Sequence, residues 1–197
     1  MAQQFINPDS TVSNSWEVTG GSAGATAHAV CADTAVFSRI RANAQNKVCR
    51  FTLSNPIVTV GTTFESIRHI ITGFKENTRS GNVEIQVIIE NSSNVALYTE
   101  NHTLTTSTQI INGTLRTTSD GSADWTGSDL SGLRVSINTS PEDPDGTSYA
   151  AVGKIQIEVN TVDASSGYGN DVMGVASANI EKVSGVATAN VEKVIGV

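Results

Sequence analysis

The stretch Asn82–Glu90 reads NVEIQVIIE, and it decides the fold expected for this chain. Alternate positions carry aliphatic side chains, which are Val83, Ile85, Val87 and Ile89. The positions between them are mostly polar, so the stretch has the two-residue period of a β-strand with one buried face. Turn-forming residues flank it on both sides. We expect Val95–Thr99 to pair with it as the second strand of a hairpin.

The same alternation extends outward from this stretch, from Ala29 to Val162. The clearest further runs are 48–53, 64–74, 133–137 and 150–162. About eight or nine strands follow one another at a spacing typical of an antiparallel sandwich. Asn112-Gly113 lies between two β-like runs and predicts a tight hairpin turn. The expected fold class is therefore all-β, an antiparallel β-sandwich of jelly-roll-like type.

Shifts in composition divide the chain into four segments. These are an N-terminal arm at 1–28, a β-sandwich at 29–162, a linker at 163–173 and a repeat tail at 174–197. The arm is polar and ends in a Gly/Ser-rich stretch, which is typical of a flexible hinge. It carries Phe5 and Trp16, the weaker candidates for contact with a neighbouring protein. For Trp16 the alternative is that its ring plugs one end of the sandwich core.

Composition and charge exclude several classes of partner. The 197 residues are 38% hydrophobic and 16% charged, and their net charge is −7. An acidic chain without lysine or arginine clusters lacks the electrostatic footprint of a nucleic-acid-binding protein. No apolar run approaches the about 18 residues of a membrane-spanning helix. The first ten residues also lack the basic and apolar regions of a secretory signal, so we expect no nucleic acid, no membrane and no signal-dependent export.

Cysteines and histidines give no sign of a metal site. Cys31 and Cys49 have no C-x-x-C partner, and the expectation is two reduced, buried thiols. A disulfide between them would require that their strands be neighbours. The histidines are His28, His69 and His102, and they lie far apart in the sequence. His69 has isoleucines around it, so we interpret it as a half-buried strand residue rather than a ligand.

The sequence carries no motif of a nucleotide-binding, serine-hydrolase or zinc-protease site, and we expect neither enzymatic activity nor a cofactor. Three carboxylates gather in one loop, at Glu142, Asp143 and Asp145. Calcium favours such oxygen ligands, but Pro-Asp-Gly is also an ordinary turn, which we favour. Three more carboxylates surround Trp125, at Asp120, Asp124 and Asp129. We expect Trp125 to pack against the edge of the sandwich.

The tail from Gly174 to Val197 is a tandem 11-residue repeat, GVASANIEKVS followed by GVATANVEKVI. We expect a short helical turn over Asn179–Val183, with Val186-Ala187 extended. Two units cannot bury their own apolar faces, because repeat units are stabilised by stacked neighbours. The tail is therefore expected to bind copies of itself or another protein. The candidates for self-association are Val175, Ile180, Val183, Val186, Val191 and Val194.

A resemblance to a known class of protein adds to this interpretation. Its residues are Asp124-Trp125, followed after four residues by Leu130-Ser131-Gly132-Leu133-Arg134-Val135, and the closing strand AVGKIQIEV at 151–159. Both resemble accessory structural proteins of tailed bacteriophage virions. The tail repeats resemble the short repeats that close many phage structural proteins. The likeness covers most of residues 100–197.

The resemblance implies a virion protein without catalytic residues. The main expectation is a capsid decoration, or cement, protein that binds the major capsid protein and stabilises the shell. We expect the protein to form a homotrimer, because closed symmetry lets a short repeat complete its core from identical neighbours. The trimer would lie on the capsid surface and be assembled in the host cytoplasm. The alternative is a phage adhesin or tail-associated glycan-binding β-sandwich. Exposed aromatic residues and calcium at Asp143 and Asp145 would mark that alternative.

Overall fold

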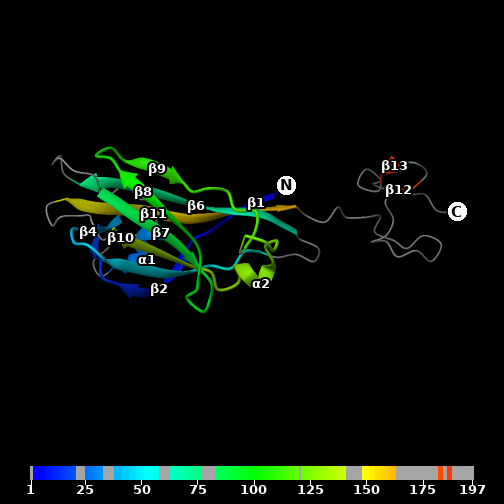
Figure 1. The fold of residues 1–197 in the computed structure, drawn as a ribbon, viewed down its shortest axis with the longest axis horizontal. Helices are drawn as coiled ribbons and strands as arrows, with labels where there is room; N and C mark the ends of the chain where they lie inside the picture. Colours follow the sequence, from blue (N-terminus) through cyan, green and yellow to red (C-terminus); the bar gives the residue numbers. More distant parts are fainter. Residues whose placement is uncertain are drawn as a thin grey trace.

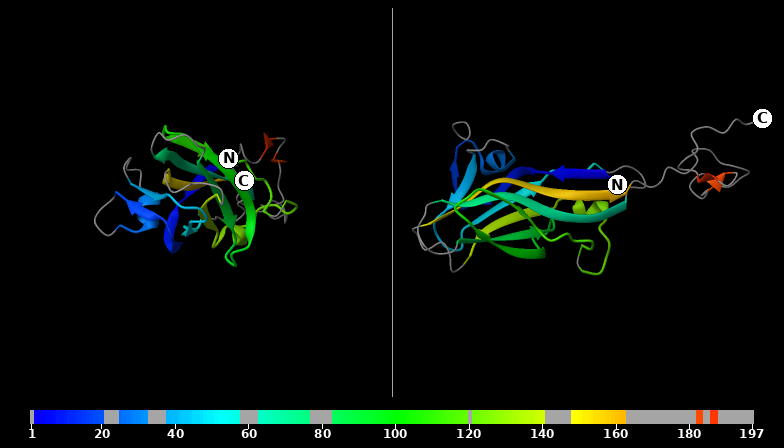
Figure 2. Two further views of the ribbon diagram at one scale, coloured as in Figure 1. Left: turned by 60° about the vertical axis from the view of Figure 1, so that its left-hand side comes forward. Right: turned by 90° about the horizontal axis from the view of Figure 1, so that it is seen from above.

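The computed structural model describes residues 2–20, 25–32, 38–57, 63–76, 83–119, 121–140 and 148–162, with two short strands at 182–183 and 186–187. Two antiparallel β-sheets pack into a sandwich (Figure 1), which confirms the expected fold class. Two long strands, β6 (Thr63–Glu76) and β11 (Tyr149–Val162), pair along the length of the molecule (Figure 2).

The first sheet has six strands. Besides β6 and β11 it contains β1 (Ala2–Ile6), β3 (Glu17–Thr19), β4 (Arg39–Ala42) and β9 (Gln109–Asn112). The strand order is β3-β4-β11-β6-β9, and β1 also pairs with β11. The strands β4 and β1 therefore pair with different lengths of β11, at 150–152 and 157–161. A bulge on β11 lies between Val152 and Ile155, next to the pairing with Gly73.

The second sheet has five strands in the order β2-β5-β10-β7-β8. Their bounds are β2 (Pro8–Asn14), β5 (Val48–Leu53), β10 (Arg134–Thr139), β7 (Val83–Glu90) and β8 (Ala96–Leu104). The predicted hairpin of β7 and β8 is confirmed by their antiparallel register. Asn94 turns the chain between them with a left-handed φ of 63°, a conformation that asparagine tolerates better than most residues.

The core lies between the sheets and follows the alternation seen in the sequence. The aliphatic residues without exposed surface include Ile85, Val87, Ile89, Val135, Ile137, Ile155, Ile157 and Val159. Burying one such side chain contributes about 1.5–3 kcal/mol. The side chains that pack the two sheets together thus come from the strands whose alternation is clearest in the sequence.

The N-terminal boundary differs from the expectation. Over its described part, the arm predicted at 1–28 is made of strands β1, β2 and β3, which are paired with β11, β5 and β4. The sandwich therefore includes residues from position 2 onward, and the predicted boundary at 29 is wrong. Most of the β2 side chains are exposed, so this edge strand lacks the alternation that revealed the others.

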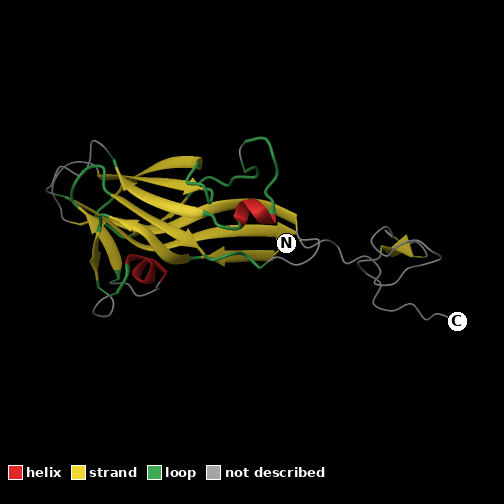
Figure 3. Cartoon of the chain, turned by 90° about the horizontal axis from the view of Figure 1, so that it is seen from below, coloured by secondary structure: helices red, strands yellow, loops and turns green. Residues whose placement is uncertain are grey.

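Two short helices interrupt a region that was expected to be all strand. Helix α1 (Ala27–Ala32) packs against β2 and β11. Its buried residues are Ala27, Val30 and Cys31, which have the i, i+3, i+4 spacing of one helix face. Helix α2 (Gly127–Leu130) has a capping box formed by Thr126 and Asp129. The helices lie toward opposite ends of the sandwich (Figure 3), and no helix in the described part is long enough to span a membrane.

Asn112-Gly113 does not form the predicted hairpin turn. Asn112 pairs with Ile70, and Arg116 pairs with Ile67, so the chain continues along β6 through Gly113. The glycine instead permits a close approach. A Cβ atom at position 113 would lie 2.3 Å from Cε1 of His69. The absence of a side chain therefore serves packing here, and not a positive φ.

The described part of the tail consists of two two-residue strands, β12 (Lys182–Val183) and β13 (Val186–Ala187). They pair antiparallel, with Val183 opposite Val186. The extended conformation predicted for Val186-Ala187 is confirmed, whereas the helical turn predicted to end at Val183 is wrong at its last two residues. The β-branched valine favours a strand at this position.

Candidate functional site

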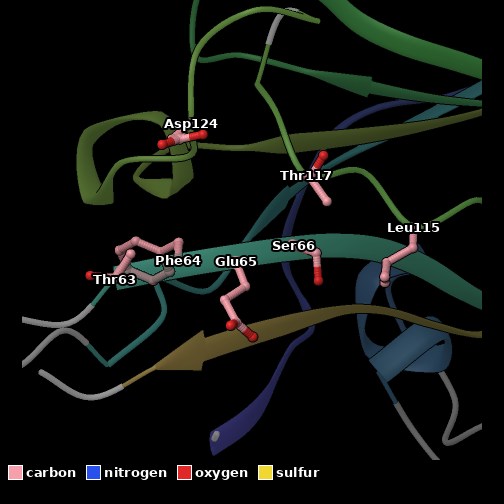
Figure 4. A pocket seen from close by; sticks show the side chains of 7 residues that line it. All are labelled: Thr63, Phe64, Glu65, Ser66, Leu115, Thr117 and Asp124. Atoms are coloured by element: carbon pink, nitrogen blue, oxygen red, sulfur yellow. The ribbon is translucent and has the colours of Figure 1, made fainter. Parts of the chain in front are cut away.

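A cleft opens at the beginning of β6, between that strand and the segment that follows β9 (Figure 4). Its volume is about 490 Å³. The residues that line it are Thr63, Phe64, Glu65, Ser66, Leu115, Thr117 and Asp124. A volume of this size is ordinary for a small-molecule site.

The cleft exists because the segment after β9 stays beside β6 only as far as the pair of Ile67 and Arg116. Ile67 and Arg116 exchange two backbone hydrogen bonds, of 2.9 and 2.8 Å. Beyond them the segment forms its own narrow loop, in which Thr118 pairs with Asp124. Among the described strands, the first residues of β6 pair with β11 alone. Their other edge faces the cleft.

Trp125 holds in place the loop that carries Asp124, which lines the cleft on the side opposite β6. Its side chain is 3% exposed, and its Nε1–H donates to the carbonyl oxygen of Arg116 at 2.9 Å. The ring thus packs against the sandwich, as expected. Immediately after it, the Thr126 Oγ1 accepts from the backbone N–H of Asp129 and starts α2. The loop bearing Asp124 is therefore held at both ends by buried or capped residues.

The lining of the cleft mixes hydroxyl, carboxylate and apolar groups. Hydroxyls come from Thr63 and Thr117, and carboxylates from Glu65 and Asp124, whereas the Ser66 hydroxyl is buried and accepts from Asn160 Nδ2. The largest exposed apolar group is Leu115, whose residue surface is 49% exposed. This arrangement offers several hydrogen-bond acceptors and donors beside one apolar contact. The described residues of the lining include no lysine, arginine or histidine.

The two carboxylates of the cleft do not face one another. In Figure 4 the Glu65 side chain extends from β6 toward β11, whereas Asp124 lies on the other side of the β6 ribbon. Glycoside hydrolysis generally requires two carboxyl groups that flank one scissile bond. The described cleft therefore has the groups of a binding site without the geometry of that reaction.

Other predicted site residues lie away from this cleft. Phe5 is 45% exposed on β1, and Trp16 is 5% exposed and belongs to the core. Trp16 therefore plugs the sandwich, the alternative that the sequence had offered for it. The contact of Phe5 with a neighbouring protein stays a prediction. Of the six tail residues, Val183 and Val186 are paired in β12 and β13, while Val175, Ile180, Val191 and Val194 lie outside the described residues.

The acidic groups have separate positions. The loop with Glu142, Asp143 and Asp145 lies outside the described residues, as does Asp120. Asp129 accepts from the backbone N–H of Thr126 at 2.9 Å and completes the capping box of α2. Asp129 thus has a structural role.

Sequence reasoning missed a second polar cluster, in the interior between the sheets. His69 on β6 and His102 on β8 bring their Nε2 atoms within 2.8 Å of one another. Glu100 lies beside both, and its carboxylate accepts from Arg116 Nη2 at 2.9 Å. His69 is fully buried, which corrects the half-buried position expected for it. The third histidine, His28, instead contacts Thr11 beside α1.

The two cysteines are free and buried, as expected. Burial raises the pKa of the Cys49 thiol to about 12. Burial, together with the neighbouring Cys49, also raises the pKa of Cys31. Both thiols are therefore protonated at neutral pH, which makes them poor nucleophiles and poor metal ligands.

Comparisons with known proteins assign no family. No family model matches the chain, and no curated protein matches it. Among solved structures, it is similar to the CBM36-1 domain of a multidomain xylanase from the hindgut metagenome of Trinervitermes trinervoides, with 9% identity and a TM-score of 0.42, over 81% of this chain and 97% of that domain. Arabinose-bound MgGH51 α-L-arabinofuranosidase gives 11% identity and a TM-score of 0.43, over 78% of this chain but 23% of that one.

A third solved structure, described as "CBM4 structure and function", shows 12% identity and a TM-score of 0.34, over 64% of this chain and 82% of its own. All three TM-scores lie below 0.5. These likenesses therefore identify neither a family nor a ligand, and the fold rests on the strand pairing described above. The chain is a β-sandwich whose function has to be argued from its own residues.

Proposed function

We propose that this chain is a non-catalytic binding module that takes a neutral saccharide in the cleft at the start of β6. The observation that carries the proposal is the lining, which combines the exposed hydroxyls of Thr63 and Thr117, two carboxylates and the exposed side chain of Leu115. Sugar hydroxyls donate to carboxylates and exchange hydrogen bonds with hydroxyls. The C–H face of a sugar ring would pack on Leu115.

The charge of the lining selects among polar ligands. With Glu65 and Asp124, and with no cationic side chain among its described lining residues, the cleft disfavours phosphates, sulfates and acidic sugars. Aromatic stacking contributes little, because Phe64, the one aromatic residue among the described lining residues, is 5% exposed. We therefore expect modest affinity that depends on hydrogen bonds to carboxylates.

Isothermal titration calorimetry of the full chain tests the proposal, with neutral di- and tetrasaccharides of pentoses and hexoses as probes. Asp124→Asn removes one charged acceptor from the cleft, and Asp9→Asn is the matched control on the exposed face of β2. Leu115→Ala removes the apolar contact, and Ile110→Ala is its control, since Ile110 is exposed outside the lining.

We expect Asp124→Asn to raise the dissociation constant by about tenfold or more, which is the usual effect of losing a hydrogen bond to a charged group. Leu115→Ala should weaken binding by a smaller factor. The two controls should bind as the wild type does. The absence of binding heat with every sugar, or an equal loss in Asp9→Asn, would contradict a saccharide site in this cleft.

We propose an assembly role as the second candidate, that of a virion surface protein that binds the major capsid protein as a homotrimer. The specific support is the tail, where Val183 pairs with Val186 in a hairpin whose strands have two residues each. An isolated two-stranded hairpin is marginally stable in water. Its stability therefore calls for a partner, either further copies of the tail or another protein.

Light scattering of the full chain and of a truncation ending at Ser165 tests self-association. A trimeric full chain and a monomeric truncation would support the tail as the trimerisation element. If both are trimers, the sandwich makes the contact. Two monomers would rule out self-association through the tail, and co-sedimentation with capsid shells would then test binding to the major capsid protein.

A further inference from the structure

A polar cluster joins the two sheets at the edge formed by β8 and β9. The inward faces of neighbouring β6 residues are aliphatic, with Ile67 and Ile71 fully buried on either side of His69. His69 belongs to the six-stranded sheet, whereas Glu100 and His102 belong to β8 of the five-stranded sheet. These three side chains are therefore brought together only by the packing of one sheet on the other.

The three ligating atoms converge. The Nε2 atoms of His69 and His102 are 2.8 Å apart, and Oε2 of Glu100 lies 4.0 and 3.9 Å from them. Each residue thus offers one ligand atom, an imidazole nitrogen or a carboxylate oxygen, that lies within 4.8 Å of the ligand atoms of the other two. Around a tetrahedral Zn²⁺ with bonds of about 2.0–2.1 Å, two ligand atoms are separated by about 3.3 Å. Shifts of about half an ångström would therefore produce that geometry.

The protonation states suit metal ligation. Burial lowers the pKa of His69 to about 4, and His102 beside it acts in the same direction. Burial also lowers the pKa of His102, although Glu100 opposes this. Burial opposes ionisation of Glu100, but hydrogen bonds from Thr114 and Arg116 outweigh it and lower its pKa. At neutral pH the cluster thus holds two neutral imidazoles and one carboxylate.

Surrounding residues fix the candidate ligands in place. Arg116 Nη2 donates to Oε1 of Glu100 at 2.9 Å, and the backbone N–H of Thr114 donates to Oε2 at 3.0 Å. A carboxylate oxygen has more than one acceptor site, so Oε2 keeps a lone pair for a metal. Gly113 covers the His69 ring, as described above. Such second-layer contacts hold metal ligands in orientation.

The metal-free cluster is poorly satisfied. The two imidazoles can share one hydrogen bond between their Nε2 atoms, in which one nitrogen donates and the other accepts. Nδ1 of His69 is buried and has no hydrogen-bond partner among the described residues. A buried polar group without a partner is costly to stability. The polar contacts of the His69 ring are therefore concentrated at Nε2, the atom that lies beside His102 and Glu100.

We propose that His69, Glu100 and His102 form a binding site for a divalent transition metal of the Zn²⁺ class, which links the two sheets. Two imidazoles and a carboxylate are ligands typical of zinc. The side chains of Glu100 and His102 are 12% and 16% exposed, so a water molecule can complete the coordination. The role is a structural link, in addition to the cleft and independent of it.

The test uses the untagged full chain, stripped with a chelator and titrated with Zn²⁺ in a calorimeter. His102→Ala removes the most exposed ligand of the pair of histidines and should leave the fold intact. Glu100→Gln keeps the shape but removes the charge. His28→Ala is the matched control, because His28 lies outside the cluster and contacts Thr11.

We expect one Zn²⁺ per chain and a melting temperature that rises with Zn²⁺. Loss of a residue that only supports a metal ligand lowers metal affinity by about 10–100-fold. His102→Ala removes a ligand itself, so the affinity for Zn²⁺ should fall by at least this factor and the thermal shift should disappear. His28→Ala should behave as the wild type does. Failure of the wild type to take up Zn²⁺, or an equal loss in His28→Ala, would overturn the site and leave a hydrogen-bonded histidine pair.

Discussion

Two parts of β6 lie only a few residues apart and differ in what covers them. Over Thr63–Ser66 one edge of the strand faces the cleft, and Glu65 is partly exposed. Over Ile67–Ile71 the same edge is covered by residues 111–116, and His69 is fully buried. Residues 111–116 thus enclose the inward-pointing side chain of His69, whereas no described strand covers the same edge beside Thr63–Ser66.

This difference has an energetic consequence. A solvated polar group can change with little effect on the free energy of unfolding, so the open part of β6 is free to specialise in binding. An enclosed group must have partners, and its loss or displacement destabilises the fold. The predictions below set the two parts of the strand against each other.

The largest contrast is expected between Ile71→Ala and Leu115→Ala. Ile71 has no exposed surface beside His69, whereas Leu115 is half-exposed in the cleft. Truncating Ile71 leaves a cavity and should reduce the free energy of unfolding by about 2–5 kcal/mol. Leu115→Ala should stay within about 0.5 kcal/mol. Urea denaturation measures both, and equal losses would contradict the distinction between covered and open parts.

Gly113→Ala tests the cover over His69 directly. The added Cβ would lie within 2.7 Å of three atoms of the imidazole of His69, which is fully buried. Overpacking of this kind should cost about 1–3 kcal/mol. Gly153→Ala is the control, because its nearest contact would be an ordinary 3.5 Å. Chemical denaturation of the pair decides whether Gly113 is required for close approach.

Thr126→Ala tests the wall on the open side. The substitution removes the side chain that accepts from the N–H of Asp129 and begins α2. Loss of such a cap costs about 1 kcal/mol. Thr106→Ala, an exposed threonine between β8 and β9, should leave the melting temperature unchanged. A cap variant as stable as this control would show that α2 does not hold the wall.

The smallest effect concerns the ion pair between Glu158 on β11 and Arg68 on β6, and its dependence on pH. Burial opposes ionisation of Glu158, but hydrogen bonds from Arg68 and Asn160 outweigh it, and the pKa of the carboxyl is lowered. A carboxyl with a lowered folded-state pKa stabilises the fold above its unfolded pKa and loses this contribution as pH falls. Urea curves at neutral pH and at about pH 3 should therefore show a smaller loss in Glu158→Gln than in the wild type.

Much of the sandwich could be predicted because buried strands alternate. The run Val83–Glu90 and its pairing with the following strand appear in the structure as expected. The arm was misjudged because β2 is exposed on both faces over most of its length. An edge strand of this kind carries no periodic signal. Helix α1 has six residues, too few for a helical period to stand out from the alternation around it.

The sites could not be predicted for a different reason. His69 and His102 are 33 residues apart in the chain, and their contact depends on how two sheets pack. The cleft depends on where the segment after β9 leaves β6, which happens after the pair of Ile67 and Arg116. Gly113 gave a signal that was assigned to a turn, because Asn-Gly is a common hairpin sequence. Its actual cause is an imidazole ring more than forty positions earlier, at His69.

The shared edge of β11 has a kinetic consequence. Ala2 pairs with Thr161, so the strand made first in the sandwich must wait for nearly the whole domain before its partner exists. Pairing over such separations is entropically costly, and β folds of this kind form in about milliseconds to seconds. During synthesis the unpaired edge would be open to other chains. Stopped-flow refolding, followed by fluorescence of the buried Trp16 and Trp125, would time the closure.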